Sequence, residues 1–331
     1  MATDLGKVGM RARGDWSSST AYEVLDAVSY NNGLYIAKQA VPANTLPTNT
    51  TYWQVAIDAN IFMPDGYNHN GIYRGKNLGT ISTLAGFESF LTEHEVSTGK
   101  FTDLYLGDYI KIQDGTYNAE WMIAGFGTEA NKGTTNVPTK NTLSMVPRTN
   151  LGNASMNSTN TSGVSKNTNN PLYATTGGNE MTGYQAYWGS DMAQITMPAV
   201  NTALATVLGS HLKDRDIRCS DTRDPALISR AIDGRTGAAS GWNLKAVKAA
   251  LMTEVQVYGS MVASSSYYDT GEGNSQLPVF KFINSMAFIK SNFWLRGVSS
   301  SSEFTLAASN GSAVSLTASS ATGVRPLIVV G

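Results

Sequence analysis

The chain has 331 residues, enough for two domains or for one large domain with an appendage. Its 24 basic and 25 acidic side chains leave a net charge of −1, which argues against a nucleic-acid binder, because such a protein needs a basic stripe to neutralise phosphates. The single cysteine, Cys219, excludes an internal disulfide and a four-cysteine zinc site. No apolar run reaches the roughly 18 residues of a membrane span, so we expect no membrane insertion.

Charged residues make up only 15% of the chain, below the roughly 25% of an ordinary soluble domain. Serine, threonine, asparagine and glycine must therefore supply most of the solubility, which is typical of extracellular or particle-bound proteins. The N-terminus lacks a signal peptide, so we expect synthesis in a cytoplasm. Together these features fit a component of a virus particle that is released by lysis.

Residues 1–60 are expected to form a small β module. Apolar and polar side chains alternate over 26–30, and Asn31-Asn32-Gly33 tolerates positive φ before a second strand over 34–37. This pattern predicts a β-hairpin. The domain boundary is expected near 58–66, and residues 67–331 show no second break.

The larger part of the chain mixes helical and strand periodicities, so the predicted class is α+β. The expected elements are a helix over 81–94 capped by Ser82, paired strands over 104–112 and 120–126, a long polar surface excursion over 127–180, helices over 198–212 and 243–252, and strands over 293–298 and 327–330.

The sequence offers no positive sign of catalysis, and we predict neither a metal site nor a cofactor. The carboxylates of Asp103 and Asp108, or of Asp214 and Asp216, could form an acid–base pair, but solvated or capping roles are more common. His211 is expected to be an ordinary helix-surface histidine. No Ser–His–Asp or Cys–His arrangement can be nominated.

A spaced aromatic series marks the N-terminal module: Trp16, Tyr22, Asp26-x-Val28-x-Tyr30, Tyr35-x-Ala37 and Trp53 after a Pro-containing loop. It resembles the small chitin- and cellulose-binding modules of carbohydrate-binding families five and twelve over about the first 57 residues. The resemblance implies an all-β fold and glycan stacking. The stacking candidates are Trp16, Tyr30, Tyr35 and Trp53. Alternatively, these rings form the core, and the module docks the chain to other virion proteins.

The C-terminal part contains two short motifs, Phe293-Trp-Leu-Arg-Gly297 and Gly323-Val-Arg-Pro326, which bracket about 25 residues with mostly small side chains. Together with upstream segments such as Glu254-Val-Gln-Val-Tyr-Gly-Ser260, they resemble the C-type-lectin-like proteins of gut bacteriophages over residues 67–331. That group includes targets of diversity-generating retroelements, which rewrite a segment between motifs of this kind. The resemblance implies a C-type-lectin-like fold and a variable binding face.

A variable binding face needs a rigid scaffold beneath it. Trp294, Leu295, Val324, Leu327 and Val329 are expected in the core, and Arg296 and Arg325 are expected to bond neighbouring carbonyls. The outward-facing candidates are Ser299, Ser300, Ser301, Ser302, Glu303, Thr305, Ser309, Asn310, Ser312, Ser315 and Thr317. Phe304 is the only aromatic residue between the two motifs, so binding should be weak per site and should depend on multivalent display.

The predicted function is therefore a non-enzymatic bacteriophage virion adhesion protein, either a tail-fibre or a baseplate receptor-binding protein. It would contact a host surface protein or glycan and would be displayed as a homotrimer. The alternative is a head fibre or capsid decoration protein with an adhesive or stabilising role. A carbohydrate-active enzyme would need an acid–base carboxylate pair in a cleft.

Overall fold

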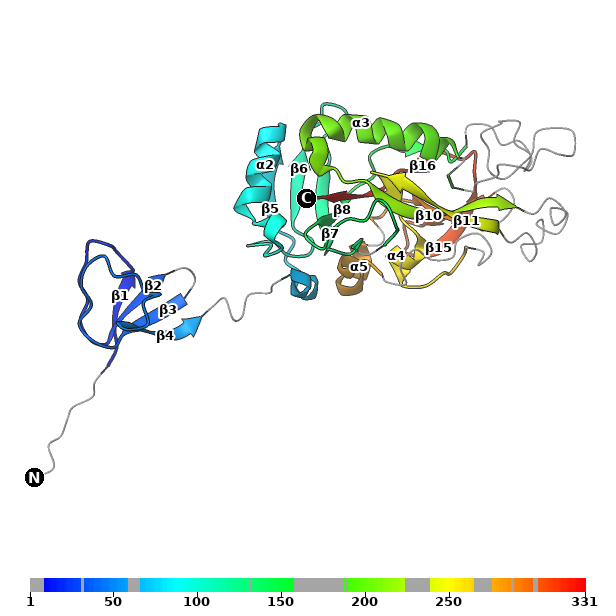
Figure 1. Cartoon of the computed structure of the whole chain (residues 1–331). Helices are drawn as coiled ribbons and strands as arrows, with labels where there is room; N and C mark the ends of the chain where they lie inside the picture. The colour runs from blue at the N-terminus through cyan, green and yellow to red at the C-terminus, as the bar shows by residue number, and fades with distance from the viewer. Residues whose placement is uncertain are drawn as a thin grey trace, which may run out of the picture. The chain divides into compact units, whose positions relative to one another are not determined.

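The structure is a computed structural model of the chain. It describes residues 9–30, 33–58, 66–130, 132–157, 187–188, 190–223, 239–264, 276–286, 289–299 and 303–331. The chain divides into two compact units, Met1–Pro64 and Asp65–Gly331, which are described separately (Figure 1). None of the helices in the described ranges has the length and apolar character needed to cross a bilayer.

The smaller unit is a four-stranded sheet in the order β1-β2-β3-β4 (Figure 1). Its strands are β1 (Arg11–Asp15), β2 (Asp26–Tyr30), β3 (Gly33–Ala37) and β4 (Trp53–Asp58). The β2–β3 hairpin is confirmed, with Val28 opposite Tyr35 in the antiparallel register. β1 lies parallel to β2 and forms one edge of the sheet, with β4 at the other.

The core of the smaller unit is built mainly from aromatic residues. Trp53 and Tyr22 are buried with their rings in edge contact, 5.3 Å between centroids, and Val28 and Val41 pack around them. In so small a module a few large side chains must supply most of the buried apolar area. These aromatic residues therefore have a structural role whether or not the module binds a ligand.

The larger unit is mixed α+β and contains two sheets and a two-stranded ribbon. The six-stranded sheet has the order β12-β17-β8-β7-β6-β5, and the five-stranded sheet has the order β15-β14-β13-β16-β9. The strands are β5 (Asn77–Ile81), β6 (Tyr109–Ile112), β7 (Glu120–Phe126), β8 (Leu143–Pro147), β9 (Asn153–Ala154), β10 (Arg215–Arg223), β11 (Ala239–Val247), β12 (Ala250–Leu251), β13 (Phe293–Val298), β14 (Glu303–Ala307), β15 (Ala313–Thr317), β16 (Thr322–Gly323) and β17 (Pro326–Val330).

Helices cover part of this unit (Figure 1). They are α2 (Leu84–Glu93), α3 (Met197–Leu208), α4 (Glu254–Tyr258) and α5 (Pro278–Phe282), with short 3-10 turns η1 (Gly66–Gly71), η2 (Val96–Thr98), η4 (Gly209–His211) and η6 (Asn284–Met286), and one π-helical turn, η3 (Met192–Thr196). The predicted helix over 198–212 is confirmed as α3 and η4, and Pro198 sits at its first turn.

The six-stranded sheet is buried on both faces, as successive residues of β7 show. Trp121 and Ile123 belong to a core with Phe87 of α2, whereas Met122 and Ala124 belong to a second core with α5 and β13. Because side chains alternate between the faces of a strand, the two cores must lie on opposite sides of the sheet. This explains why β7 has six consecutive buried residues.

Three sequence predictions need correction. The expected helix over 243–252 is wrong, since β11 runs to Val247 and residues 250–251 form β12, which pairs with β17. The cap of α2 is Thr83, whose side chain accepts from the Gly86 N–H, rather than Ser82. The first expected strand begins only at Tyr109, because residues 104–108 are mostly irregular and make only an isolated β-bridge, between Leu106 and Tyr73.

The predicted surface excursion over 127–180 is also wrong in its described part. β8 lies within it, is buried at every residue and occupies an inner position between β17 and β7. Its sequence, Leu-Ser-Met-Val-Pro, is too short to stand out among the surrounding polar residues. Residues 158–180 of the expected excursion lie outside the described residues.

A buried charge cluster joins four separate segments of the larger unit. Glu129, 1% exposed, accepts hydrogen bonds from Arg215 Nη1 at 3.3 Å, from Lys132 Nζ at 3.0 Å and from Gln256 Nε2 at 3.4 Å. Arg215 also donates through Nη2 to the carbonyl of Leu327 in β17, at 3.2 Å. Burial alone would raise the pKa of Glu129, but the charges of Arg215 and Lys132 hold it below its ordinary value.

We expect Glu129→Gln to lower the free energy of unfolding of the larger unit by about 3 kcal/mol, because it leaves buried cations without their carboxylate. Urea unfolding followed by tryptophan fluorescence measures the loss. The matched control is Glu93→Gln, an exposed position on α2. Equal stability of the two variants would show that the cluster does not hold the fold.

Candidate binding surfaces

The two motifs that bracket the C-terminal segment form a rigid frame. β13 and β17 are buried at every residue, which places Trp294, Leu295, Leu327 and Val329 in the core as predicted. Trp294 Nε1 donates to the carbonyl of Ala154 at 2.8 Å, and so ties β13 to β9. Both strands that flank the segment between the motifs are therefore held by buried contacts.

The two frame arginines are buried. Arg325 donates through Nε to the carbonyl of Pro147 at 2.9 Å, as predicted, and its guanidinium lies 4.9 Å from the ring centre of Phe293. Arg296 is 4% exposed, and its charge helps to lower the pKa of Glu129. The frame is thus connected to the buried charge cluster.

The segment between the motifs folds as a β-hairpin of β14 and β15. β14 is largely buried, whereas β15 is partly exposed along its length. Thr305 is fully buried and donates through Oγ1 to the carbonyl of Gly297, so its predicted outward position is wrong. Phe304 is also fully buried and is not available to a ligand. Ser300, Ser301 and Ser302 lie outside the described residues.

The remaining candidates are accessible on this hairpin and its ends, and we call them the display surface. It consists of Ser299, Glu303, Ser309, Asn310, Ser312, Ser315 and Thr317. The four in the turn and in the middle of β15 are exposed, and the other three are half-buried. Ser315 Oγ donates to the Glu303 carboxylate at 3.0 Å. The display surface therefore offers hydroxyls and amides around one carboxylate.

The turn of the hairpin is held by its own polar groups. Asn310 Oδ1 accepts from the Ser312 N–H at 3.0 Å and from its hydroxyl at 2.7 Å, while Asn292 Oδ1 accepts from the Ser309 N–H at 2.8 Å. Gly311 has φ +91°, a conformation that favours glycine. These bonds preorganise the side chains that the turn presents.

Tyr258 is a contact that the sequence analysis did not identify. Its hydroxyl donates to the carbonyl of Ser312 at 3.1 Å, and so joins α4 to the turn. Burial and the nearby negative charge of Glu254 raise the pKa of Tyr258 to about 12, so the phenol remains a donor at neutral pH. The only sequence signal was its place in the Glu254–Ser260 segment.

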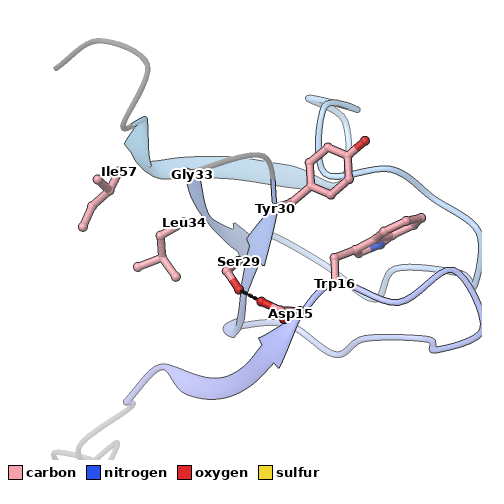
Figure 2. Close-up of a pocket in the computed structure, with 7 residues that line it drawn as sticks. All are labelled: Asp15, Trp16, Ser29, Tyr30, Gly33, Leu34 and Ile57. Atoms are coloured by element: carbon pink, nitrogen blue, oxygen red, sulfur yellow. Dashed lines mark hydrogen bonds between the residues drawn. The ribbon is translucent and has the colours of Figure 1, made fainter. Parts of the chain in front are cut away.

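The smaller unit has an open pocket of about 570 Å³ (Figure 2). It is lined by Asp15, Trp16, Ser29, Tyr30, Gly33, Leu34 and Ile57. The Trp16 and Tyr30 rings meet edge to face, 5.4 Å between centroids. In Figure 2 they lie at one end, Leu34 and Ile57 at the other, and the hydrogen-bonded Asp15 and Ser29 between them.

Only two of the four proposed stacking residues can reach a ligand here. Trp53 is 2% exposed and Tyr35 is 8% exposed, so both belong to the core and the prediction is wrong for them. Trp16 and Tyr30 are half-buried and line the pocket. The Nε1 atoms of Trp16 and Trp53 both donate to the carbonyl of Thr45, which fixes the orientation of the Trp16 ring.

The carboxylates considered for acid–base chemistry hold local structure instead. Asp108 is fully buried and accepts from Arg74 and from the backbone N–H groups of Lys76 and Tyr105, while Asp103 pairs with Arg74 and Lys76. No group of three potential ligands among the described histidine, cysteine, aspartate and glutamate residues could hold a metal ion.

Asp216 and His211 also make structural contacts. Burial alone would raise the pKa of Asp216, but hydrogen bonds from the backbone of 134–136 and from the Asn136 side chain lower it to about 2. His211 is half-buried against Phe87, with Nε2 3.7 Å from the Glu88 carboxylate. These contacts give both residues structural roles in the larger unit.

Replacing Trp53 and Trp16 in turn distinguishes a role in the core from a role in lining the pocket. We expect Trp53→Ala to destabilise this unit by about 3–5 kcal/mol, because it empties the core. Trp16→Ala should cost about 1 kcal/mol, because that ring is half-buried. Calorimetry of the full chain measures both changes, and equal losses would contradict the assignment of Trp16 to the pocket.

Comparison with known proteins adds no relative: no protein-family model matches the chain, and neither a curated protein nor a solved structure matches it.

Proposed function

We propose that the chain is a non-enzymatic bacteriophage virion adhesion protein. Its larger unit is a C-type-lectin-like display domain that contacts a host surface protein or glycan through the display surface. Its smaller unit docks the chain to other proteins of the particle. Within this class, a tail-fibre or baseplate receptor-binding protein is the first choice, and a head fibre or capsid decoration protein is the alternative.

The observation that carries the proposal is the contrast between a buried frame and an exposed polar hairpin. β13 and β17 are buried throughout, while Ser309, Asn310, Ser312 and Ser315 are exposed on the hairpin that this frame supports. A binding surface whose side chains change needs strands beneath it that do not move. The same contrast is found where recognition loops are mounted on a sheet scaffold.

The chemistry of the display surface favours weak, multivalent binding. Serine, threonine and asparagine supply adaptable hydrogen bonds, whereas rigid aromatic rings usually supply the contact area. Phe304 is buried, so the described part of the hairpin presents no aromatic ring. Several copies on one particle would then be needed for firm attachment.

The pocket of the smaller unit supports a second candidate function, the binding of a sugar ring. Trp16 and Tyr30 offer aromatic surface to the C–H face of a sugar, and Asp15 and Ser29 lie beside them to bond hydroxyls. Such binding would add a glycan contact to the particle and is compatible with docking through other surfaces of the unit.

Competition for adsorption tests the display surface. The purified full chain should block adsorption of the phage to its host, and Ser315→Tyr should weaken this block at least tenfold, because a bulky ring fills the exposed surface. Ser89→Tyr, the same change at an exposed position on α2, should block as well as the unchanged chain. Equal competition by the two variants would contradict the assignment of the site.

Titration with chitin and cellulose oligosaccharides tests the pocket. We expect Trp16→Ala to weaken sugar binding by the full chain at least tenfold, measured by calorimetry, because the stacking surface is lost. Val24→Ala is the control, since Val24 is exposed in the same unit but does not line the pocket. If the unchanged chain binds neither sugar series, docking is left as the role of this unit.

A further inference from the structure

The outer strand of the five-stranded sheet, β15, has one unpaired side among the described residues. It pairs with β14 over five consecutive residues, from Ala313 opposite Ala307 to Thr317 opposite Glu303, without a register shift. No described strand pairs with its other side. A strand edge of this kind can pair with another chain.

The hydrogen bonds of the hairpin show which backbone groups face outward. The Ala308 N–H donates to the carbonyl of Ser312, so these two residues form a hydrogen-bonded pair. In an antiparallel ladder such pairs alternate, which makes Val314 the next residue of β15 that bonds to β14. Ala313 and Ser315 therefore direct their N–H and C=O groups away from β14.

The hydrogen bond of the Glu303 carbonyl in β14 also shows which residues of β15 direct their backbone groups outward. It accepts from the Ser299 N–H, so this residue of β14 bonds toward β13. Its partner in β15, Thr317, then belongs to the outward-facing series with Ala313 and Ser315. The Thr317 carbonyl is used by the Ser320 N–H, whereas no hydrogen bond within the described part of the chain uses the backbone of Ala313 or Ser315 on this edge.

The edge of β15 lacks the features that protect other edges of this protein. β1 carries three charged residues and a register shift, β5 has a register shift at its pairing with β6, and β9 and β12 contain two residues each. β15 reads Ala-Val-Ser-Leu-Thr, without a charge, proline or bulge, and its Val314 is 38% exposed. Natural proteins usually block an edge of this kind.

We propose that β15 pairs antiparallel with β15 of a second copy of this chain, about a two-fold axis at Val314. In this register Ala313 of each copy lies opposite Ser315 of the other. The four outward backbone groups of each copy are then all bonded across the interface. The two Val314 side chains meet on the axis, and no charge lies there to oppose the contact.

The self-complementary register is the reason for choosing a second copy over another partner. A strand that pairs with itself forms an isologous contact, which closes as a dimer instead of the homotrimer expected from the sequence. One short strand pair buries less than the roughly 1,000 Å² of a stable interface, so the dimer should be weak and should depend on concentration. Display of many copies on one particle would supply that concentration.

Disulfide trapping tests the register. In a Cys219→Ser background, Val314→Cys should form an intermolecular disulfide under mild oxidation, because non-hydrogen-bonded pairs bring opposite side chains close enough for an S–S bond. Ser309→Cys is the matched control, exposed on the same hairpin but away from the axis. We expect the covalent dimer to form at least tenfold faster with Val314→Cys.

Two further measurements complete the test. Adding Ser315→Pro to the Val314→Cys chain removes an outward N–H without removing a bond to β14, and should slow the cross-link at least fivefold. Sedimentation of the unchanged chain should show a monomer–dimer equilibrium. The proposal would be overturned if the chain stays monomeric at all concentrations, if it forms a trimer, or if the two cysteine variants cross-link equally. The partner of the edge would then be a strand of another protein.

Discussion

The ion pair between Glu129 and Arg215 is the interaction on which the larger unit depends. Glu129 follows β7, Arg215 begins β10, and Gln256 of α4 and Arg296 of β13 act on the same carboxylate. Arg215 also donates a hydrogen bond to the carbonyl of Leu327 in β17. A charge this deeply buried is tolerated only with partners, so these segments must assemble together.

This arrangement lets one region of the unit vary without loss of the fold. The charged and apolar contacts that hold β13 and β17 are buried, whereas the exposed hydroxyls and amides of the hairpin contribute little to packing. Substitution of exposed side chains usually changes stability by about 0.5 kcal/mol or less. The backbone of β15 stays the same when its side chains change, so pairing through that edge would be compatible with variation.

The sequence predicted the elements whose pattern is local. The 26–37 hairpin, the α3 helix and the strands at 293–298 and 327–330 follow from alternation, turn residues and a proline at the helix start. The sequence-based prediction was wrong where pairing with a distant strand determines the structure. Residues 250–251 form a strand because they pair with β17, and β8 lies at an inner position of the sheet although it comes from a polar part of the sequence. Thr305 and Trp53 were misplaced for a related reason, because alternation and aromatic spacing do not show which face is buried.

Immunogold electron microscopy of intact virions, with antibody against residues 67–331, tests most directly whether the chain is a particle-borne adhesion protein. We expect gold on the particle surface, at the tail tip for a receptor-binding protein or over the head for a capsid fibre. Particles without any gold, in a preparation whose lysate contains the protein, would contradict this expectation.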